Sequence, residues 1–172
     1  VLVRHGGCAG AARNLGMYRA TSPRITFCDS DDVLPPTALE RMLDASLTTG
    51  AQVVVGAMET FPKPTNWAWK DHFGKGDQTF GSLAEMPELV HSASACNKLF
   101  DLSYLRSHDI RFAEGVHFED AYVGVSALVG IMSRSPRSGS RHHLGANRSN
   151  LNKVAEISGV GRSFPQSFSQ VL

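Results

Sequence analysis

The feature of this sequence most suggestive of chemistry is a short apolar run that ends in three carboxylates. Residues 25–28 (ITFC) are followed directly by Asp29, Asp31 and Asp32. Carboxylates crowded at the end of a strand repel one another. A divalent cation such as Mg²⁺ or Mn²⁺ relieves that repulsion, because it prefers oxygen ligands and keeps coordination sites for substrate phosphates. The same acids also fit a solvated turn whose aspartates cap the next helix, so the run alone leaves both interpretations open.

Two basic residues are candidates for contacts to a phosphate. Arg13 lies in the segment GAARNLG (residues 10–16), in the first turns of a predicted helix. Such a helix start offers free N–H groups to an anion, and a guanidinium adds two parallel hydrogen bonds. Lys98, in ACNKLF (residues 95–100), is a second candidate. Surface salt bridges are the alternative for both residues.

These segments, together with the pair Glu119-Asp120, stand in an order and spacing that resemble a known family. Across about residues 1–132 the chain resembles family 2 glycosyltransferases of the GT-A fold, whose pattern is G-x-x-x-A-R-N-x-G, a strand into D-x-D-D, N-K-L-F and an E-D pair. The resemblance implies an α/β, Rossmann-like domain with a mostly parallel sheet flanked by helices. It also implies transfer of a sugar from a nucleotide-sugar donor to an acceptor hydroxyl, with a bound metal and inversion.

The resemblance also implies roles for the acidic residues. Asp29 lies near the ribose or the metal, Asp31 is the expected direct metal ligand, and Asp32 supports it or caps the next helix. Asp120 is the expected general base for the acceptor hydroxyl, with Glu119 beside it. The implied acceptor is a glycan, a polyol polymer or a lipid-linked molecule. Two adjacent acids at a helix start are also ordinary capping residues.

Composition indicates one soluble globular domain. The chain has 172 residues, of which 42% are hydrophobic and 19% charged. It has no apolar run long enough to span a membrane and no signal-peptide core. Its cysteines, Cys8, Cys28 and Cys96, are odd in number and far apart. This spacing argues against a disulfide framework or a zinc site, and it favours a reduced, cytoplasmic setting.

The charge of the chain is divided unevenly. Residues 133–172 hold six basic residues and one acidic residue, a net +5 in a chain whose total is +1, so residues 1–132 sum to −4. We predict a partial GT-A domain over 1–132 and a basic, weakly structured segment over 133–172. A solvated tail is the favoured interpretation, with no nucleic-acid partner, and peripheral association with the inner face of a membrane stays open.

Periodicity and turn residues predict the elements that position these groups. Helix 11–20 precedes strand 24–28, and a second helix carries Leu39, Met42, Leu43 and Leu47 on one face and closes at Gly50. A buried strand over 51–58 follows, which predicts a right-handed crossover and parallel pairing. The remaining expectations are an irregular segment over 59–81 with Trp67 and Trp69, and a helix over 118–132 that is buried on nearly every face.

The chain also departs from the family pattern. It starts near the family's third strand, and beyond residue 132 the resemblance fades. We therefore expect a domain that is incomplete at its amino terminus, with apolar faces such as that of helix 39–47 uncovered and catalysis lost through truncation.

Two alternatives from other classes remain. The chain fits a non-catalytic remnant or interaction module. The run after the first strand also resembles haloacid-dehalogenase-like phosphatases, with Asp29 as nucleophile and Asp31 as acid/base. That family needs a later acidic pair to complete a Mg²⁺ site, and nothing in the sequence clearly supplies one.

Overall fold

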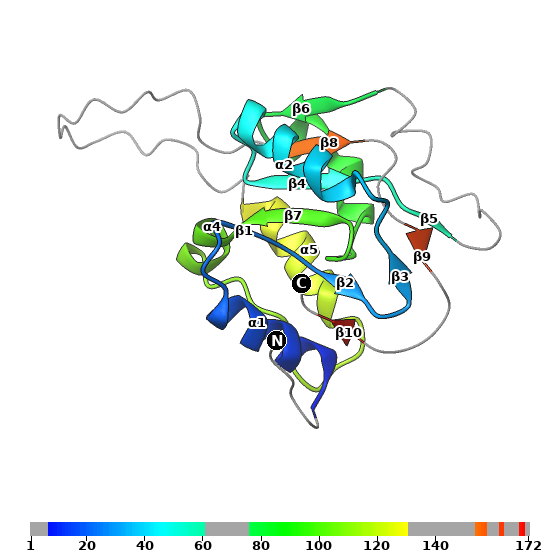
Figure 1. The fold of residues 1–172 in the computed structure, drawn as a ribbon. Helices are drawn as coiled ribbons and strands as arrows, with labels where there is room; N and C mark the ends of the chain where they lie inside the picture. The colour runs from blue at the N-terminus through cyan, green and yellow to red at the C-terminus, as the bar shows by residue number, and fades with distance from the viewer. Residues whose placement is uncertain (1–6, 61–75, 131–153, 158–161, 164–168, 171–172) are drawn as a thin grey trace, which may run out of the picture.

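The main structural element is a five-stranded sheet in the order β1-β7-β4-β8-β6 (Figure 1). The computed structural model describes residues 7–60, 76–130, 154–157, 162–163 and 169–170. In sheet order, the strands are Arg24–Thr26 (β1), Lys98–Asp101 (β7), Val53–Gly56 (β4), Val154–Ile157 (β8) and Gln78–Phe80 (β6).

The strand directions confirm part of what the sequence predicts. Strands β1 and β4 run in the same direction, but β7 lies between them and is antiparallel to both. Strand β8 is parallel to β4, and β6 is antiparallel to β8. The α/β class is confirmed. The predicted crossover joins β1 and β4, but these two strands are not neighbours because β7 lies between them. Among the five strands, only β4 and β8 form a parallel pair.

Alternating apolar side chains give the sheet two buried faces. Val53 and Val55 pack in one core with Phe100, whereas Val54 and Leu99 pack in the other. Successive strand residues point to opposite faces, so a continuous apolar run such as VVVG is suited to a strand covered on both sides. Helix α2 (Ala38–Thr49) covers one face and helix α5 (Glu119–Gly130) the other (Figure 1).

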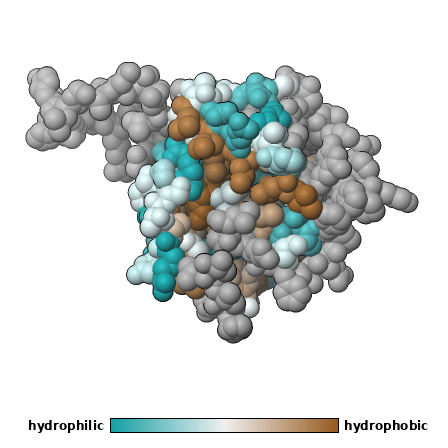
Figure 2. Space-filling view, in the orientation of Figure 1, coloured by the Kyte–Doolittle hydropathy of each residue, from teal (hydrophilic) through white to brown (hydrophobic). Residues whose placement is uncertain are grey.

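Helix α2 buries a different face from the one its leucines suggest. Met42 is 1% exposed, but Leu39, Leu43 and Leu47 are 43%, 41% and 66% exposed. The four residues predicted to share one buried face therefore do not all face the sheet. Met42 packs against the sheet together with Ala38, whereas each leucine follows a sheet-facing position by one residue and points away. Apolar surface is visible on this side of the molecule in Figure 2. As predicted, the helix ends at Gly50, which is left-handed (φ 70°).

Helix α5 is buried on one side only. Val123, Ala127 and Leu128 are fully buried, whereas Tyr122 is 60% exposed, so the expectation of burial on nearly every face is wrong. Gly124 allows the helix to approach the chain closely, because a Cβ there would lie 2.0 Å from the carbonyl oxygen of Ala93. None of the helices that the structure describes is both long enough and apolar enough to cross a membrane.

The remaining helical elements contribute side chains to the same core as helix α5. Helix α1 covers Ala9–Arg19, close to the predicted 11–20. Two short 3₁₀ turns, η1 (Leu83–Glu85) and η2 (Pro87–His91), lead into β7, and α4 (Leu102–Ser107) follows it. Sequence patterns did not predict η1, η2, β7 or α4, because each is too short to show a clear period.

Short strands hold the carboxylate segment in place. Strand β2 (Cys28–Asp29) pairs with β10 (Ser169–Gln170), and β3 (Asp32–Val33) pairs with β9 (Arg162–Ser163). Strand β9 also pairs with β5 (Glu59–Thr60). Strands β8, β9 and β10, which follow residue 132, all pair with earlier strands. The division of the chain at residue 132 stays a prediction.

The segment predicted to be irregular is partly regular. Strands β5 and β6 occupy its two ends, so the expectation is wrong there. Its centre, with Trp67 and Trp69, lies outside the described residues, as does the predicted strand end at residues 1–3.

Candidate functional site

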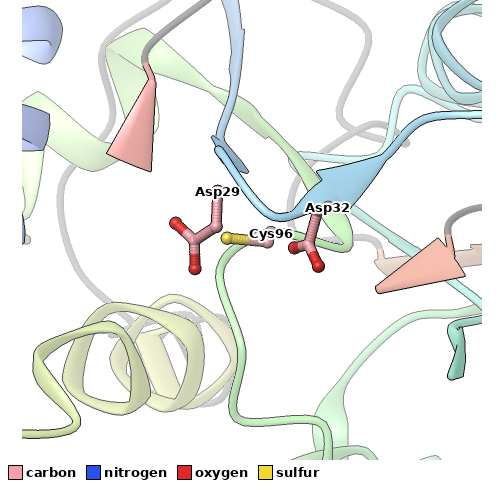
Figure 3. Close-up of side chains that lie close together, drawn as sticks. All are labelled: Asp29, Asp32 and Cys96. Atoms are coloured by element: carbon pink, nitrogen blue, oxygen red, sulfur yellow. The ribbon is translucent and has the colours of Figure 1, made fainter. Parts of the chain in front are cut away.

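The carboxylate segment forms a cluster with a cysteine from a distant part of the chain. Buried Phe27 separates β1 from β2, and the chain then turns through Asp29 and Asp32. One ligand atom each from Asp29, Asp32 and Cys96 lies within 4.8 Å of the other two. Figure 3 shows the Cys96 side chain between the two aspartates. Asp31, the expected direct metal ligand, is not part of this group.

Burial and the nearby negative charges both shift the pKa values of the cluster. Burial, and after it the nearby charges of Asp29 and Asp31, raises the pKa of Asp32 to about 6. Burial and the charge of Asp29 likewise raise the pKa of the Cys96 thiol, so a protonated sulfur lies beside the carboxylates. A cation placed here would offset the repulsion among the neighbouring carboxylates.

Arg13 joins this cluster to the second acidic motif. The residue is 3% exposed, and its Nη2 donates to Asp29 Oδ1 and its Nη1 to Glu119 Oε1, each at 2.5 Å. Burial alone would lower the pKa of Arg13, but the hydrogen bond and charge of Asp29 and the hydrogen bond to Glu119 outweigh it and raise the pKa. Three of the predicted motifs therefore meet through one guanidinium.

This geometry changes the interpretation of Arg13. Both of its terminal amino groups are engaged with carboxylates, which favours a bridging role for the residue over the predicted phosphate contact. The phosphate contact stays a prediction.

The Phe112 ring packs against the Arg13 guanidinium. The guanidinium carbon of Arg13 lies 5.2 Å from the centroid of the Phe112 ring, and that ring meets Phe27 edge-on at 4.8 Å. Asn14 holds the Phe112 backbone on both sides: its Nδ2 donates to the carbonyl oxygen and its Oδ1 accepts from the N–H, each at 2.9 Å. Sequence reasoning did not predict these two residues for the site, although Asn14 stands beside Arg13 in the A-R-N motif.

Lys98 is buried beneath the site. It is 0% exposed, and its Nζ donates to the carbonyl oxygens of Ser92 and Ser94 and to Asn97 Oδ1. Burial lowers the pKa of Lys98 to about 7, against the opposing charge of Asp120. This arrangement favours a role for Lys98 in fixing the loop before β7. The phosphate contact stays a prediction.

The pair Glu119-Asp120 opens helix α5 as predicted. Both residues are half-buried. Phe118, directly before them, is 85% exposed and has a left-handed backbone (φ 62°). A bulky residue in this conformation is strained, and such strain is concentrated at functional sites. The turn at Phe118 brings the start of α5 toward Arg13.

Comparison with known proteins shows a family match. Residues 2–108 match the family model described as "Glycosyl transferase family 2". A curated relative, the succinoglycan biosynthesis protein ExoO of Rhizobium meliloti (strain 1021), is 23% identical over 154 residues. That alignment covers 78% of this chain and 42% of the relative, so the chain spans about two fifths of its length.

Solved structures show the same fold. TarS 1-349 of S. aureus in complex with UDP-GlcNAc matches with a TM-score of 0.71 at 17% identity, covering 97% of this chain and 42% of that one. The same protein in complex with UDP matches with a TM-score of 0.67 at 17% identity, covering 90% and 39%. At this identity the likeness establishes the fold alone.

The Arg13 bridge predicts a large loss of stability when it is removed. Arg13→Met leaves Asp29 and Glu119 without their cation, and breaking a buried pair in this way costs on the order of 3 kcal/mol. Arg111→Met is the matched control, because its partner Asp109 is 76% exposed, and surface pairs contribute about 0–1 kcal/mol. Urea denaturation of both variants measures the difference, and equal midpoints would contradict the bridging role.

The raised pKa of Asp32 predicts a stability difference that depends on pH. Because the folded pKa, about 6, exceeds the ordinary 3.8, folding disfavours the charged carboxylate, and the cost appears as pH rises from about 4 through 6. Asp32→Asn should therefore melt like the parent below pH 4 and at a higher temperature above pH 7. Thermal melts across pH test this, with the exposed Asp44→Asn as control for net charge. A variant less stable than the parent at pH 7.5 would refute it.

Proposed function

The chain belongs to glycosyl transferase family 2, and on that premise we propose that a protein containing it transfers a sugar from a nucleotide-sugar donor to an acceptor hydroxyl. The proposed reaction uses a divalent cation, Mg²⁺ or Mn²⁺, and inverts the sugar carbon. It takes place where the Asp29–Asp32 turn faces the start of α5.

The observation that carries the proposal is the Arg13 bridge. Transfer needs a site for the departing nucleoside diphosphate and, facing it, a base for the acceptor. The bridge holds an acid of the first site, Asp29, and an acid of the second, Glu119, on one buried guanidinium. A buried contact that joins both sites keeps their reacting groups at a fixed distance and orientation, and such positioning is a large part of catalysis.

The donor set fits a divalent cation. Asp29 and Asp32 offer carboxylate oxygens, the ligands that Mg²⁺ and Mn²⁺ prefer. Burial, and after it the charges of Asp29 and Asp31, raises the pKa of Asp32, so the fold disfavours its charged form and a bound cation would favour it. Asp29 and Asp32 would hold the ion, which when bound would neutralise charge on the leaving diphosphate as a Lewis acid. Asp31 is half-buried on the same turn and stays available as a further ligand.

The residues at the start of α5 provide the other half of the reaction. Arg13 engages Glu119 and so fixes the orientation of the helix start. Asp120, the next residue, is proposed as the base that takes the proton of the acceptor hydroxyl as that oxygen attacks the sugar carbon. Attack from the side opposite the diphosphate inverts that carbon.

The structural neighbours suggest the class of donor. Two of them are TarS in complex with UDP-GlcNAc and with UDP. We propose a uridine diphosphate sugar as donor and a glycan, polyol polymer or lipid-linked molecule as acceptor. The family match favours this function over the haloacid-dehalogenase-like alternative.

The proposed donor site predicts that nucleotide binding depends on a cation. UDP should bind in the presence of Mn²⁺ and not in its absence, and Asp32→Asn should weaken that binding by about tenfold or more, because one charged ligand is lost. Isothermal titration calorimetry measures this, with Asp44→Asn on α2 as the control. Because Asp32→Asn is expected to be at least as stable as the parent at pH 7.5, lost binding would not reflect unfolding. Equal UDP affinity with and without Mn²⁺ would rule out the metal-dependent site.

The proposed base predicts a separate effect on turnover. In a protein that contains this chain and transfers sugar, Asp120→Asn should lower kcat by about 10²–10⁴-fold and leave UDP affinity nearly unchanged. A helix cap would behave differently, because Asn caps about as well as Asp. Near-normal turnover of Asp120→Asn would therefore assign the residue to structure.

A further inference from the structure

We propose that Cys96 supplies a sulfur ligand to the Asp29–Asp32 cluster, so that this site binds thiophilic divalent cations such as Cd²⁺ and Zn²⁺ more tightly than Mg²⁺. The inference deepens the proposed donor site and rests on its metal. It adds a ligand and a metal preference that the family's carboxylate motif does not contain.

The first support is the position of the sulfur. Cys96 is 7% exposed, and Figure 3 shows its side chain between Asp29 and Asp32 with the sulfur directed toward Asp29. The three ligand atoms lie within 4.8 Å of one another. Bonds of about 2.0–2.3 Å place the ligands of one zinc ion roughly 3.5 Å apart. Small side-chain rotations therefore suffice for all three to reach one ion.

The second support is the rigidity of the loop that carries Cys96. Its N–H donates to Ser94 Oγ at 3.1 Å. The buried ammonium of Lys98 holds the carbonyl oxygens of Ser92 and Ser94, and Asn97 Nδ2 donates to the carbonyl oxygen of Gly56 at 2.7 Å. A ligand held by a fixed loop keeps its geometry when the ion leaves, which is what a metal site requires.

Ligand chemistry then sets the metal preference. Mg²⁺ favours oxygen ligands throughout, whereas thiolate sulfur selects softer ions. On binding, the thiol proton leaves to solvent and the sulfur lone pair forms the bond to the ion, without any change of oxidation state. A site with two carboxylates and one sulfur should thus accept Mg²⁺ through its oxygens alone but bind Cd²⁺ or Zn²⁺ through all three groups.

A simpler role for Cys96 predicts a different result. A thiol that only donates a hydrogen bond to Asp29 would orient that carboxylate for any cation. Cys96→Ser separates the two roles, because a hydroxyl keeps the hydrogen bond and loses the soft ligand.

The experiment is a titration of the chain with Cd²⁺ alone, followed by the ultraviolet sulfur-to-cadmium charge-transfer absorption and by calorimetry. We expect the band in the parent and in the double variant Cys8→Ser/Cys28→Ser, whose remaining thiol is Cys96. In Cys96→Ser the band should disappear and Cd²⁺ affinity should fall about tenfold or more, while Mg²⁺ affinity changes less than about twofold.

Three outcomes would overturn the inference: no band in the parent, a band that persists in Cys96→Ser, or a band lost in Cys8→Ser/Cys28→Ser. The double variant keeps the test decisive even if Cys96→Ser fails to fold. A UDP titration with Mg²⁺ separates this inference from the proposed function. UDP binding without a cadmium band would refute only the sulfur ligand, and a band without UDP binding would refute only the donor site.

Discussion

The buried guanidinium of Arg13 is the interaction on which the rest of the site depends. A single planar group donates to Asp29 on the turn after β1 and to Glu119 at the start of α5. Each carboxylate would be costly to bury without it, and so would the guanidinium without them. The pair of contacts therefore fixes the distance between two acidic motifs that are ninety residues apart in sequence.

The surroundings of Arg13 are built to keep that guanidinium in one place. The ring of Phe112 packs against it and contacts Phe27, two residues before Asp29. Asn14 then holds the Phe112 backbone by two hydrogen bonds. Two neighbouring residues of α1 thus have different roles. Arg13 binds the two acids and Asn14 fixes Phe112, so helix α1 holds the parts of the site together.

The Asp29–Asp32 turn and the nearby Lys98 ammonium have different electrostatic surroundings. In the Asp29–Asp32 turn, burial and then the neighbouring charges of Asp29 and Asp31 raise the pKa of Asp32. Beneath it, Lys98 is buried with its ammonium directed to carbonyl oxygens, and its pKa is lowered. The buried lysine therefore organises the loop that carries Cys96, while the turn keeps the carboxylates that we propose to bind a cation.

The sequence by itself determined the local features: the α/β class, the strand that ends in carboxylates, helix α1, the close of α2 at Gly50 and the acidic start of α5. Each follows from short-range patterns of apolar, turn and capping residues. Only the tertiary structure decided which of these groups meet. Cys96 comes from a loop 64 residues after Asp32, and its place beside the carboxylates depends on β7 lying between β1 and β4. Likewise, Met42 rather than the leucines faces the sheet, because packing against Val54 sets the rotation of α2. Such contacts depend on strand order and helix rotation, which periodicity along the chain does not encode.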